Sequence, residues 1–95
     1  MGYFVYILWN NNSRKKYIGC SADIYKRLHE HNAGYCKSTR SNRPWTIIYD
    51  EPYETLKEAR RREKFFKSSA GRIVLDDLLK KYASASVVKL ADTPA

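Results

Sequence analysis

The N-terminal part of the chain holds two short apolar runs with a polar turn between them. Residues 3–9 are aromatic or aliphatic throughout, which is typical of a buried strand. Residues 10–13 are polar turn formers, and a second β-prone run covers residues 16–20. This pattern predicts an antiparallel β-hairpin.

A helix and a third strand follow the hairpin. Ser21 is a good N-cap and Gly34 suits the position just past a helix end, so we expect a helix over residues 22–33. Residues 34–44 form a basic loop that contains glycine and serine. Residues 45–49 are predicted to form the third strand.

Two more helices are expected in the C-terminal half. Thr55 and Glu58 match a capping box, which predicts a helix that runs from there to residue 67. After a break at residues 68–71, a third, amphipathic helix is expected over residues 72–82. It is indicated by apolar residues at helical spacing, namely Leu75, Leu78, Leu79 and Tyr82.

These elements give an α/β (α+β) fold in the order β-β-α-β-α-α, in which helices flank a three-stranded antiparallel sheet. Ninety-five residues suffice for one small domain. We expect that domain to cover residues 1–83. Residues 84–95 are weakly patterned, and we expect them to form a disordered tail.

The chain is strongly basic, with eighteen Lys and Arg against ten Asp and Glu and a formal net charge of +8. This excess favours a polyanionic partner, either nucleic acid or an anionic membrane surface; a generally basic protein is the alternative. No run of about eighteen apolar residues occurs, so no membrane span is expected. The two cysteines lack CxxC spacing, which disfavours a disulfide scaffold and a zinc site. Because no secretion signal is evident, we expect a cytoplasmic protein.

Tyr6 and Tyr17 lie in the two strands of the predicted hairpin, and its register decides how they are placed. If the numbers of paired residues sum to an odd constant, as when Trp9 lies opposite Lys16, the tyrosines share a face. They then lie within about two positions of each other. An even constant puts them on opposite faces. The alternative to a functional pair is two β-forming rings that pack in the core.

Asp23, Arg27 and His31 are spaced four residues apart, so they form one stripe on the first predicted helix. A guanidinium suits a phosphate because it offers several donors in a fixed fork and keeps its charge. His31, one turn away, would assist proton transfer or contact a phosphate. The alternative is a solvated helix face with salt bridges.

Glu63 falls on the apolar stripe of the second predicted helix, with Leu56, Ala59 and Phe66. A carboxylate that points toward a core needs a partner, because its burial is otherwise costly. A divalent cation or an arginine would supply that partner, and the two alternatives stay open. One carboxylate suits Mg²⁺, which keeps several waters and takes further ligands from substrate phosphate.

Together these residues resemble the GIY-YIG nuclease family, and more closely its small stand-alone bacterial members related to the N-terminal nuclease domain of the UvrC excision-repair subunit. The likeness covers about residues 3–67. It rests on five matches in order at family-like spacing: Tyr6 in Phe4-Val5-Tyr6, Tyr17 in Tyr17-Ile18-Gly19, Arg27, His31 and Glu63. The chain departs from the family in two places. The first motif keeps only its tyrosine, and Leu75 stands near a position where many relatives carry asparagine.

The resemblance implies an endonuclease that hydrolyses phosphodiester bonds with one divalent ion, Mg²⁺ or Mn²⁺. Glu63 would bind the metal, Arg27 would neutralise charge on the phosphoryl oxygens, and His31 would assist. One tyrosine would accept the proton of the attacking water. We favour Tyr6 as that base, with Tyr17 orienting it. We expect Arg27, the metal and the second tyrosine to lower its pKa from about 10. These roles require Tyr6 and Tyr17 to share a face with Arg27 and Glu63.

The expected substrate is nucleic acid, with DNA favoured, in repair or recombination. Basic side chains would hold its backbone without reading sequence: Lys16, Lys37, Arg40, Arg43, Arg60, Arg61 and Lys64. Targeting would depend on substrate shape or on a protein partner, and the oligomeric state is open. Two other classes also stay open. One is a catalytically weak nucleic-acid-binding module of the same fold, and the other is a partner-docking domain whose charge only keeps it soluble.

Overall fold

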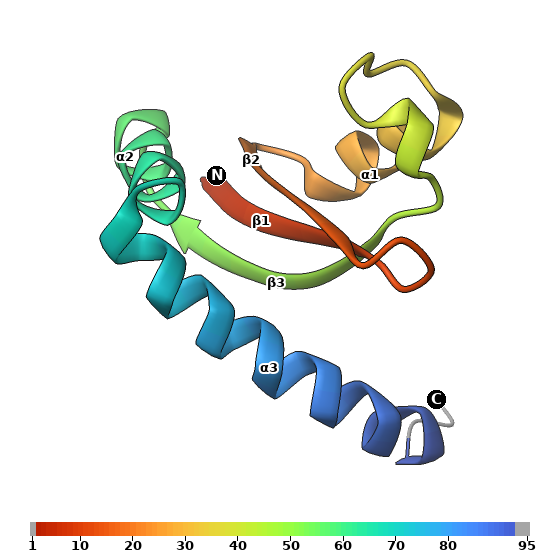
Figure 1. Ribbon diagram of the computed structural model, residues 1–95. Coiled ribbons are helices and arrows are strands. Elements are labelled where there is room, and N and C mark those ends of the chain that lie inside the picture. Colours follow the sequence, from red (N-terminus) through yellow and green to blue (C-terminus); the bar gives the residue numbers. More distant parts are fainter. Residues whose placement is uncertain (1, 93–95) are drawn as a thin grey trace. The chain divides into compact units, whose positions relative to one another are not determined.

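A computed structural model describes residues 2–92 of the chain, with side chains described as far as residue 81. The elements are β1 (Tyr3–Asn10), β2 (Lys15–Ser21), α1 (Ile24–Ala33), the 3₁₀ helix η1 (Arg40–Asn42), β3 (Thr46–Tyr53), α2 (Leu56–Phe66) and α3 (Ser69–Asp92). The strands form one antiparallel sheet in the order β2-β1-β3 (Figure 1). The predicted fold class and element order are confirmed.

In the hairpin, the numbers of paired residues sum to an odd constant, which is the register that puts Tyr6 and Tyr17 on one face. Trp9 lies opposite Lys16, and Tyr6 lies opposite Gly19. Because side chains alternate along a strand, Tyr6 and Tyr17 project from one face of the sheet, whereas Val5 and the next odd-numbered residues of β1 project from the other. The predicted sharing of a face is therefore confirmed.

Helix α1 covers the face that carries the tyrosines. Its Ile24 is buried in a cluster with Tyr6, Leu8 and Trp45, and Leu28 packs against that cluster. Ile24 and Leu28, one turn apart, form the apolar side of α1. It is the contact that holds α1 against the sheet.

The start of α1 differs from the prediction. Asp23, not Ser21, is the N-cap, and its carboxylate accepts a hydrogen bond of 3.0 Å from the backbone N–H of Lys26. The Ser21 hydroxyl bonds to the backbone of Asp23 instead. The other end is as predicted, since Gly34 adopts the left-handed conformation with φ 87° that glycine tolerates best.

The basic loop between α1 and β3 is fastened to the rest of the fold at both ends. Asn32 accepts from the backbone N–H of Trp45 at 2.6 Å and donates to its carbonyl oxygen at 3.1 Å. Near the C-terminal end of the loop, the buried side chain of Asn10 donates to the carbonyl oxygen of Asn42. Trp45 is itself only 5% exposed, so the loop is held by packing as well as by hydrogen bonds.

On the second face of the sheet, Glu51 of β3 binds Arg62 of α2. Arg62 Nε and Nη2 donate to the two carboxylate oxygens at 2.9 and 3.1 Å, and the hydroxyls of Tyr49 and Tyr53 donate to the same group. Burial alone would raise the pKa of Glu51, but these donors outweigh it and hold that pKa below its ordinary value. The bidentate pair ties α2 to β3. The capping box predicted for α2 is also present, with Thr55 and Glu58 as partners.

The chain divides after Lys64 into two compact units. In the second unit, the Ser68 side chain accepts from the backbone N–H of Gly71 at 3.2 Å, so α3 begins at Ser69 rather than at residue 72. A Cβ on Gly71 would overlap the carbonyl oxygen of Phe65, which is why the junction between α2 and α3 requires glycine. Leu75 is fully buried.

Helix α3 also continues past the predicted end at residue 82, as far as Asp92. The disordered tail proposed for residues 84–95 stays a prediction, because residues 93–95 and the side chains of residues 82–92 lie outside the described part. Among residues 2–92, no helix combines the length and the apolar character that crossing a bilayer requires.

The first prediction concerns the Glu51–Arg62 pair. Because the pKa of Glu51 is lower in the folded protein than its ordinary value of 4.5, its contribution to stability is present above that pH and is lost as the pH falls further. At pH 7, Glu51→Gln should lower the free energy of unfolding in urea by about 1–3 kcal/mol. The difference from the wild type should shrink below pH 4.5. Asp50→Asn, an exposed neighbour on the same strand, is the matched control. A deficit that is independent of pH would contradict the assignment.

Candidate active site

The two tyrosines meet above a glycine. The ring centroids of Tyr6 and Tyr17 lie 6.4 Å apart, and the rings are tilted by 42°. A Cβ placed on Gly19 would lie 2.6 Å from the Tyr6 hydroxyl and 3.1 Å from Tyr17 Cε2. The third residue of Tyr17-Ile18-Gly19 is therefore required by the close approach of both rings.

His31 lies behind this pair and is completely buried. Its Nε2 is 3.1 Å from the Tyr6 hydroxyl, and its Nδ1 is 2.8 Å from the Thr39 hydroxyl. The Tyr17 ring is 4.8 Å from the imidazole, centroid to centroid. Burial and the nearby Arg27 lower the pKa of His31, so the imidazole is neutral at neutral pH. In this arrangement His31 contacts Tyr6 and is shielded from solvent.

Arg27 completes the cluster. Its guanidinium donates to Glu30 Oε1 at 2.7 Å and lies beside the Tyr6 hydroxyl. The contact with Tyr6 raises the pKa of Arg27, although burial acts in the opposite direction, so the side chain stays charged. About one third of it is exposed, which leaves it accessible to a phosphate at the surface.

The expected lowering of the pKa of Tyr6 is wrong. Tyr6 is 1% exposed, and burial raises its pKa to about 12 even though Arg27 favours the phenolate. Desolvation of the charged form outweighs the single cation. Tyr17 lies in the same cluster but is only partly buried.

Glu63 lies apart from these four residues. Its Oε1 accepts a hydrogen bond of 3.2 Å from the thiol of Cys20. Cys20 follows Gly19 directly, so its side chain projects from the opposite face of β2 to that of Tyr17. Burial and Glu63 raise the pKa of the Cys20 thiol, while nearby Arg60 lowers it. The structure thus brings Tyr6, Tyr17 and Arg27 onto one face, as predicted. The expectation that Glu63 shares this face is wrong, because its partner Cys20 alternates with Gly19 and places Glu63 against the other face of an edge strand.

The Glu63 carboxylate fits a role in binding a hard divalent cation. Among the described residues, no cluster of three or more His, Cys, Asp or Glu side chains would enclose a metal ion by itself. Glu63 is a single, half-buried carboxylate. Mg²⁺ can bind to one such carboxylate when waters and substrate phosphates supply its other ligands. The protonated Cys20 thiol is a donor to Glu63 rather than a competing soft ligand.

The sequence profile of the GIY-YIG catalytic domain matches residues 2–73. The chain belongs to the GIY-YIG family.

Several small bacterial proteins are similar to this chain. A UPF0213 protein of Listeria welshimeri is 41% identical over 66 residues, which are 68% of this chain and 72% of that protein. A UPF0213 protein of Staphylococcus aureus is 39% identical over 62 residues, 64% of this chain and 74% of that one. The solution NMR structure of a UPF0213 protein from Bacillus halodurans is 28% identical, with a TM-score of 0.48 over 82% of this chain and 85% of that chain. Membership in the family assigns the chain to the nucleases and makes nucleic acid its class of substrate.

The basic residues predicted to grip the nucleic acid are all exposed in this GIY-YIG protein: Lys16, Lys37, Arg40, Arg43, Arg60, Arg61 and Lys64. They belong to the start of β2, the loop around η1, and α2. Arg43 also has a structural contact, because its Nε donates to the carbonyl oxygen of Arg40 at 2.8 Å. Their role in binding stays a prediction.

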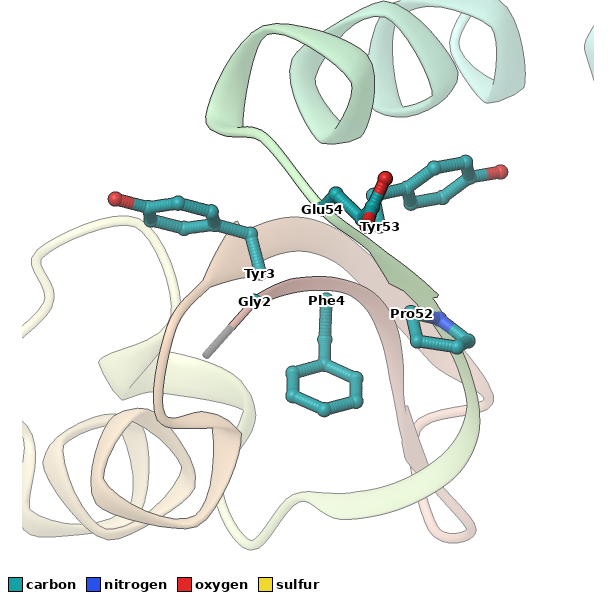
Figure 2. Close-up of a pocket in the computed structure, with 6 residues that line it drawn as sticks. All are labelled: Gly2, Tyr3, Phe4, Pro52, Tyr53 and Glu54. Atoms are coloured by element: carbon teal, nitrogen blue, oxygen red, sulfur yellow. The ribbon is translucent and has the colours of Figure 1, made fainter.

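A separate hollow lies at the other end of the sheet. It is lined by Gly2, Tyr3, Phe4, Pro52, Tyr53 and Glu54, and Figure 2 shows the rings of Tyr3 and Tyr53 directed away from each other across it. None of the residues predicted for catalysis or nucleic-acid binding lines this hollow. The candidate site at the tyrosine cluster therefore does not include this hollow.

Sequence reasoning missed Thr39, which contacts His31 from the middle of the basic loop. It is fully buried although its neighbours Ser38 and Arg40 are exposed. No spacing or motif singles it out, because it comes from a segment without regular structure. Small hydroxyl side chains are common in loops of every kind, so a threonine in a basic loop does not by itself indicate a buried contact.

The second prediction tests the packing above Gly19. Gly19→Ala should destabilise the protein by about 1–3 kcal/mol, because the new methyl group overlaps the buried Tyr6 ring. A glycine in a strand interior would otherwise gain stability from alanine. Urea unfolding gives the free energy, and near-ultraviolet circular dichroism reports the displaced tyrosines. Lys15→Ala, at an exposed position of the same strand, is the control. Equal or greater stability of Gly19→Ala would show that the two rings do not occupy this space.

Proposed function

We propose that this chain is a divalent-metal-dependent endonuclease that hydrolyses phosphodiester bonds in DNA. The observation that carries the proposal is the cluster of Tyr6, Tyr17 and Arg27 above Gly19, in a chain that belongs to a nuclease family. The net charge of +8 supports a polyanionic substrate. The likeness to the excision-repair subunit supports a role in repair or recombination.

Arg27 is the residue that meets the phosphate. It is charged, is partly exposed, and is oriented by Tyr6 on one side and Glu30 on the other. Its guanidinium stabilises the negative charge that develops on the phosphoryl oxygens as water attacks. Because its donors are already aligned, little reorganisation is needed when the substrate binds.

Tyr17 is the better proton acceptor for the attacking water. This reverses the preference for Tyr6 that the sequence suggested, because Tyr6 is buried and its pKa is raised to about 12. Tyr17 shares the face with Arg27 and is reachable from solvent. Tyr6 then has the task of aligning Arg27 and His31, for which burial is an advantage.

Glu63 would hold the metal ion, Mg²⁺ or Mn²⁺. Bound there, the ion supplies Lewis acidity to the phosphate and charge neutralisation to the leaving oxygen. Glu63 and Tyr17 lie against opposite faces of β2, which is an edge strand. The proposal therefore requires that the scissile phosphate lie along the outer edge of β2, near Gly19 and Cys20.

A second candidate function is nucleic-acid binding with feeble catalysis. The observations that favour it are the raised pKa of Tyr6 and the buried Leu75 where many relatives carry asparagine. A plasmid-nicking assay with Mg²⁺ and with Mn²⁺, run at several salt concentrations beside a filter-binding assay, separates the two functions. Metal-dependent nicking supports the endonuclease, and salt-sensitive binding without nicking supports the binding module.

The third prediction concerns Glu63. Glu63→Gln should reduce metal-dependent cleavage roughly 100-fold or more, since the carboxylate charge that holds the cation is lost. The affinity for DNA in the absence of metal should stay within about twofold, because the exposed basic residues are unchanged. Glu54→Gln, an exposed carboxylate that lines the separate hollow, is the control and should cleave normally. Wild-type cleavage by Glu63→Gln would remove the metal role.

The fourth prediction separates the two tyrosines. Tyr17→Phe should lower kcat by about 10²–10⁴-fold, because the proton acceptor is gone. Tyr6→Phe should lower kcat less but should cost about 1–3 kcal/mol of stability, because it leaves His31 Nε2 buried without a partner. Single-turnover cleavage and urea unfolding measure the two effects. A greater loss of rate in Tyr6→Phe than in Tyr17→Phe would restore Tyr6 as the base.

A further inference from the structure

The Thr39 side chain lies at the end of a line of buried polar groups that leads to the active site. Its hydroxyl oxygen is 2.8 Å from His31 Nδ1 and 3.3 Å from the carbonyl oxygen of Cys36. His31 Nε2 is in turn 3.1 Å from the Tyr6 hydroxyl. Thr39, His31 and Tyr6 are each 1% exposed or less, so bulk water does not supply alternative partners.

One arrangement of protons gives every group in this line a partner. In it, the single hydroxyl proton of Thr39 goes to the carbonyl oxygen of Cys36, which only accepts. The Thr39 oxygen then accepts from Nδ1–H of His31. Because the imidazole is neutral, Nε2 carries no proton and accepts from the Tyr6 hydroxyl. Every proton in the line has a partner.

The reverse direction is less favourable. If Thr39 donated to Nδ1, His31 would donate from Nε2 to the Tyr6 oxygen, and the Tyr6 proton would have to point toward the cationic Arg27 that lies beside it. The first arrangement instead turns the lone pairs of the Tyr6 oxygen toward Arg27, whose guanidinium only donates.

We propose that Thr39 is a positioning residue of the active site: its hydroxyl holds His31 as the Nδ1–H tautomer, which directs the Tyr6 proton inward and presents the Tyr6 oxygen to Arg27. The inference rests on the proposed function, since it gives the line a role in aligning the arginine that meets the phosphate. It assigns this alignment to the basic loop, which sequence analysis treated only as a surface for binding DNA.

The backbone of Thr39 is fixed independently of its hydroxyl. Its carbonyl oxygen accepts from Trp45 Nε1 at 3.0 Å and from the backbone N–H of Asn42 at 3.2 Å. Its own N–H donates to the carbonyl oxygen of Cys36 at 3.1 Å. A side chain of the same shape without the hydroxyl is therefore expected to leave the loop in place, so Thr39→Val is the informative variant and Thr39→Ser is its matched control.

The first measurement is the tautomer of His31 in the metal-free protein at pH 7.5, read from the ¹⁵N chemical shifts of the ring nitrogens. His29, the other histidine of the chain, is exposed and serves as the internal reference. The wild type and Thr39→Ser should show His31 as Nδ1–H. Thr39→Val should show a mixture of tautomers or Nε2–H, because Nδ1–H has lost its acceptor.

The second measurement is single-turnover cleavage. Thr39→Val should lower kcat about 10- to 100-fold with KM and the Kd for DNA within about twofold, because the arginine is misaligned while the surface cations are unchanged. Thr39→Ser should restore the rate to within about threefold of the wild type. A loop that merely packs would lose KM and kcat together and would not be rescued by serine.

Each outcome decides the inference. If His31 of the wild type is the Nε2–H tautomer, the inference is wrong, whether or not Thr39→Val folds. It is also wrong if a folded Thr39→Val has the same His31 tautomer and the same cleavage rate as the wild type. If no variant and no wild-type preparation cleaves DNA, the proposed function fails. The tautomer change between wild type, Thr39→Ser and Thr39→Val then still decides whether Thr39 sets the state of His31.

Discussion

The alignment of Tyr6 opposite Gly19 in the β1–β2 pair is the constraint on which the rest of the site depends. A shift of one residue would turn the Tyr17 ring to the other face of the sheet, away from His31 and α1. In the observed register, the missing side chain of Gly19 leaves room for both rings. The tyrosines then meet α1, whose own position is set by Ile24 and Leu28 against the sheet. Strand register and helix packing together bring Arg27 beside Tyr6.

The polar groups of this cluster differ in burial, and this difference determines which of them are charged. Tyr6 and His31 are removed from water, so desolvation raises the pKa of the first, lowers that of the second and keeps both neutral. Neutral buried partners make directional hydrogen bonds without an uncompensated charge. Arg27 stays charged at the boundary with solvent, where a phosphate would bind. The interior thus provides orientation and the surface provides charge.

The sequence predicted the elements well because their signals are local. The alternation of side chains, the capping box of α2 and the glycine after α1 each act within a few residues, and the structure has all three. The N-cap of α1 was misplaced because Ser21 and Asp23 are both capping residues two positions apart, and only the backbone path decides between them.

The parts of the site that sequence reasoning missed depend on contacts between distant elements. Thr39 meets His31 because the loop is fastened by Asn32 and Trp45, and no pattern in the loop itself indicates this. The pKa of Tyr6 was expected to fall because a nearby cation is visible in the sequence, whereas the degree of burial that reverses the shift is not. Burial of this kind depends on contacts between elements that are distant in the sequence, so it arises only in the assembled fold.

The separation of Glu63 from the tyrosines follows from the same alternation that unites Tyr6 with Tyr17. Gly19 and Cys20 are consecutive, so one lies under the rings while the other turns its thiol to Glu63 on the opposite face. A metal held by Glu63 and a proton acceptor at Tyr17 act on one phosphate only if that phosphate follows the outer edge of β2. An edge strand permits this, because no further strand covers its outer side in the described sheet. Arg60, which lies near Cys20, places a cation on the Glu63 side of that edge, and Arg27 places one on the tyrosine side. Positive charge flanking both faces of one edge strand is the arrangement that would hold a polyanionic backbone there.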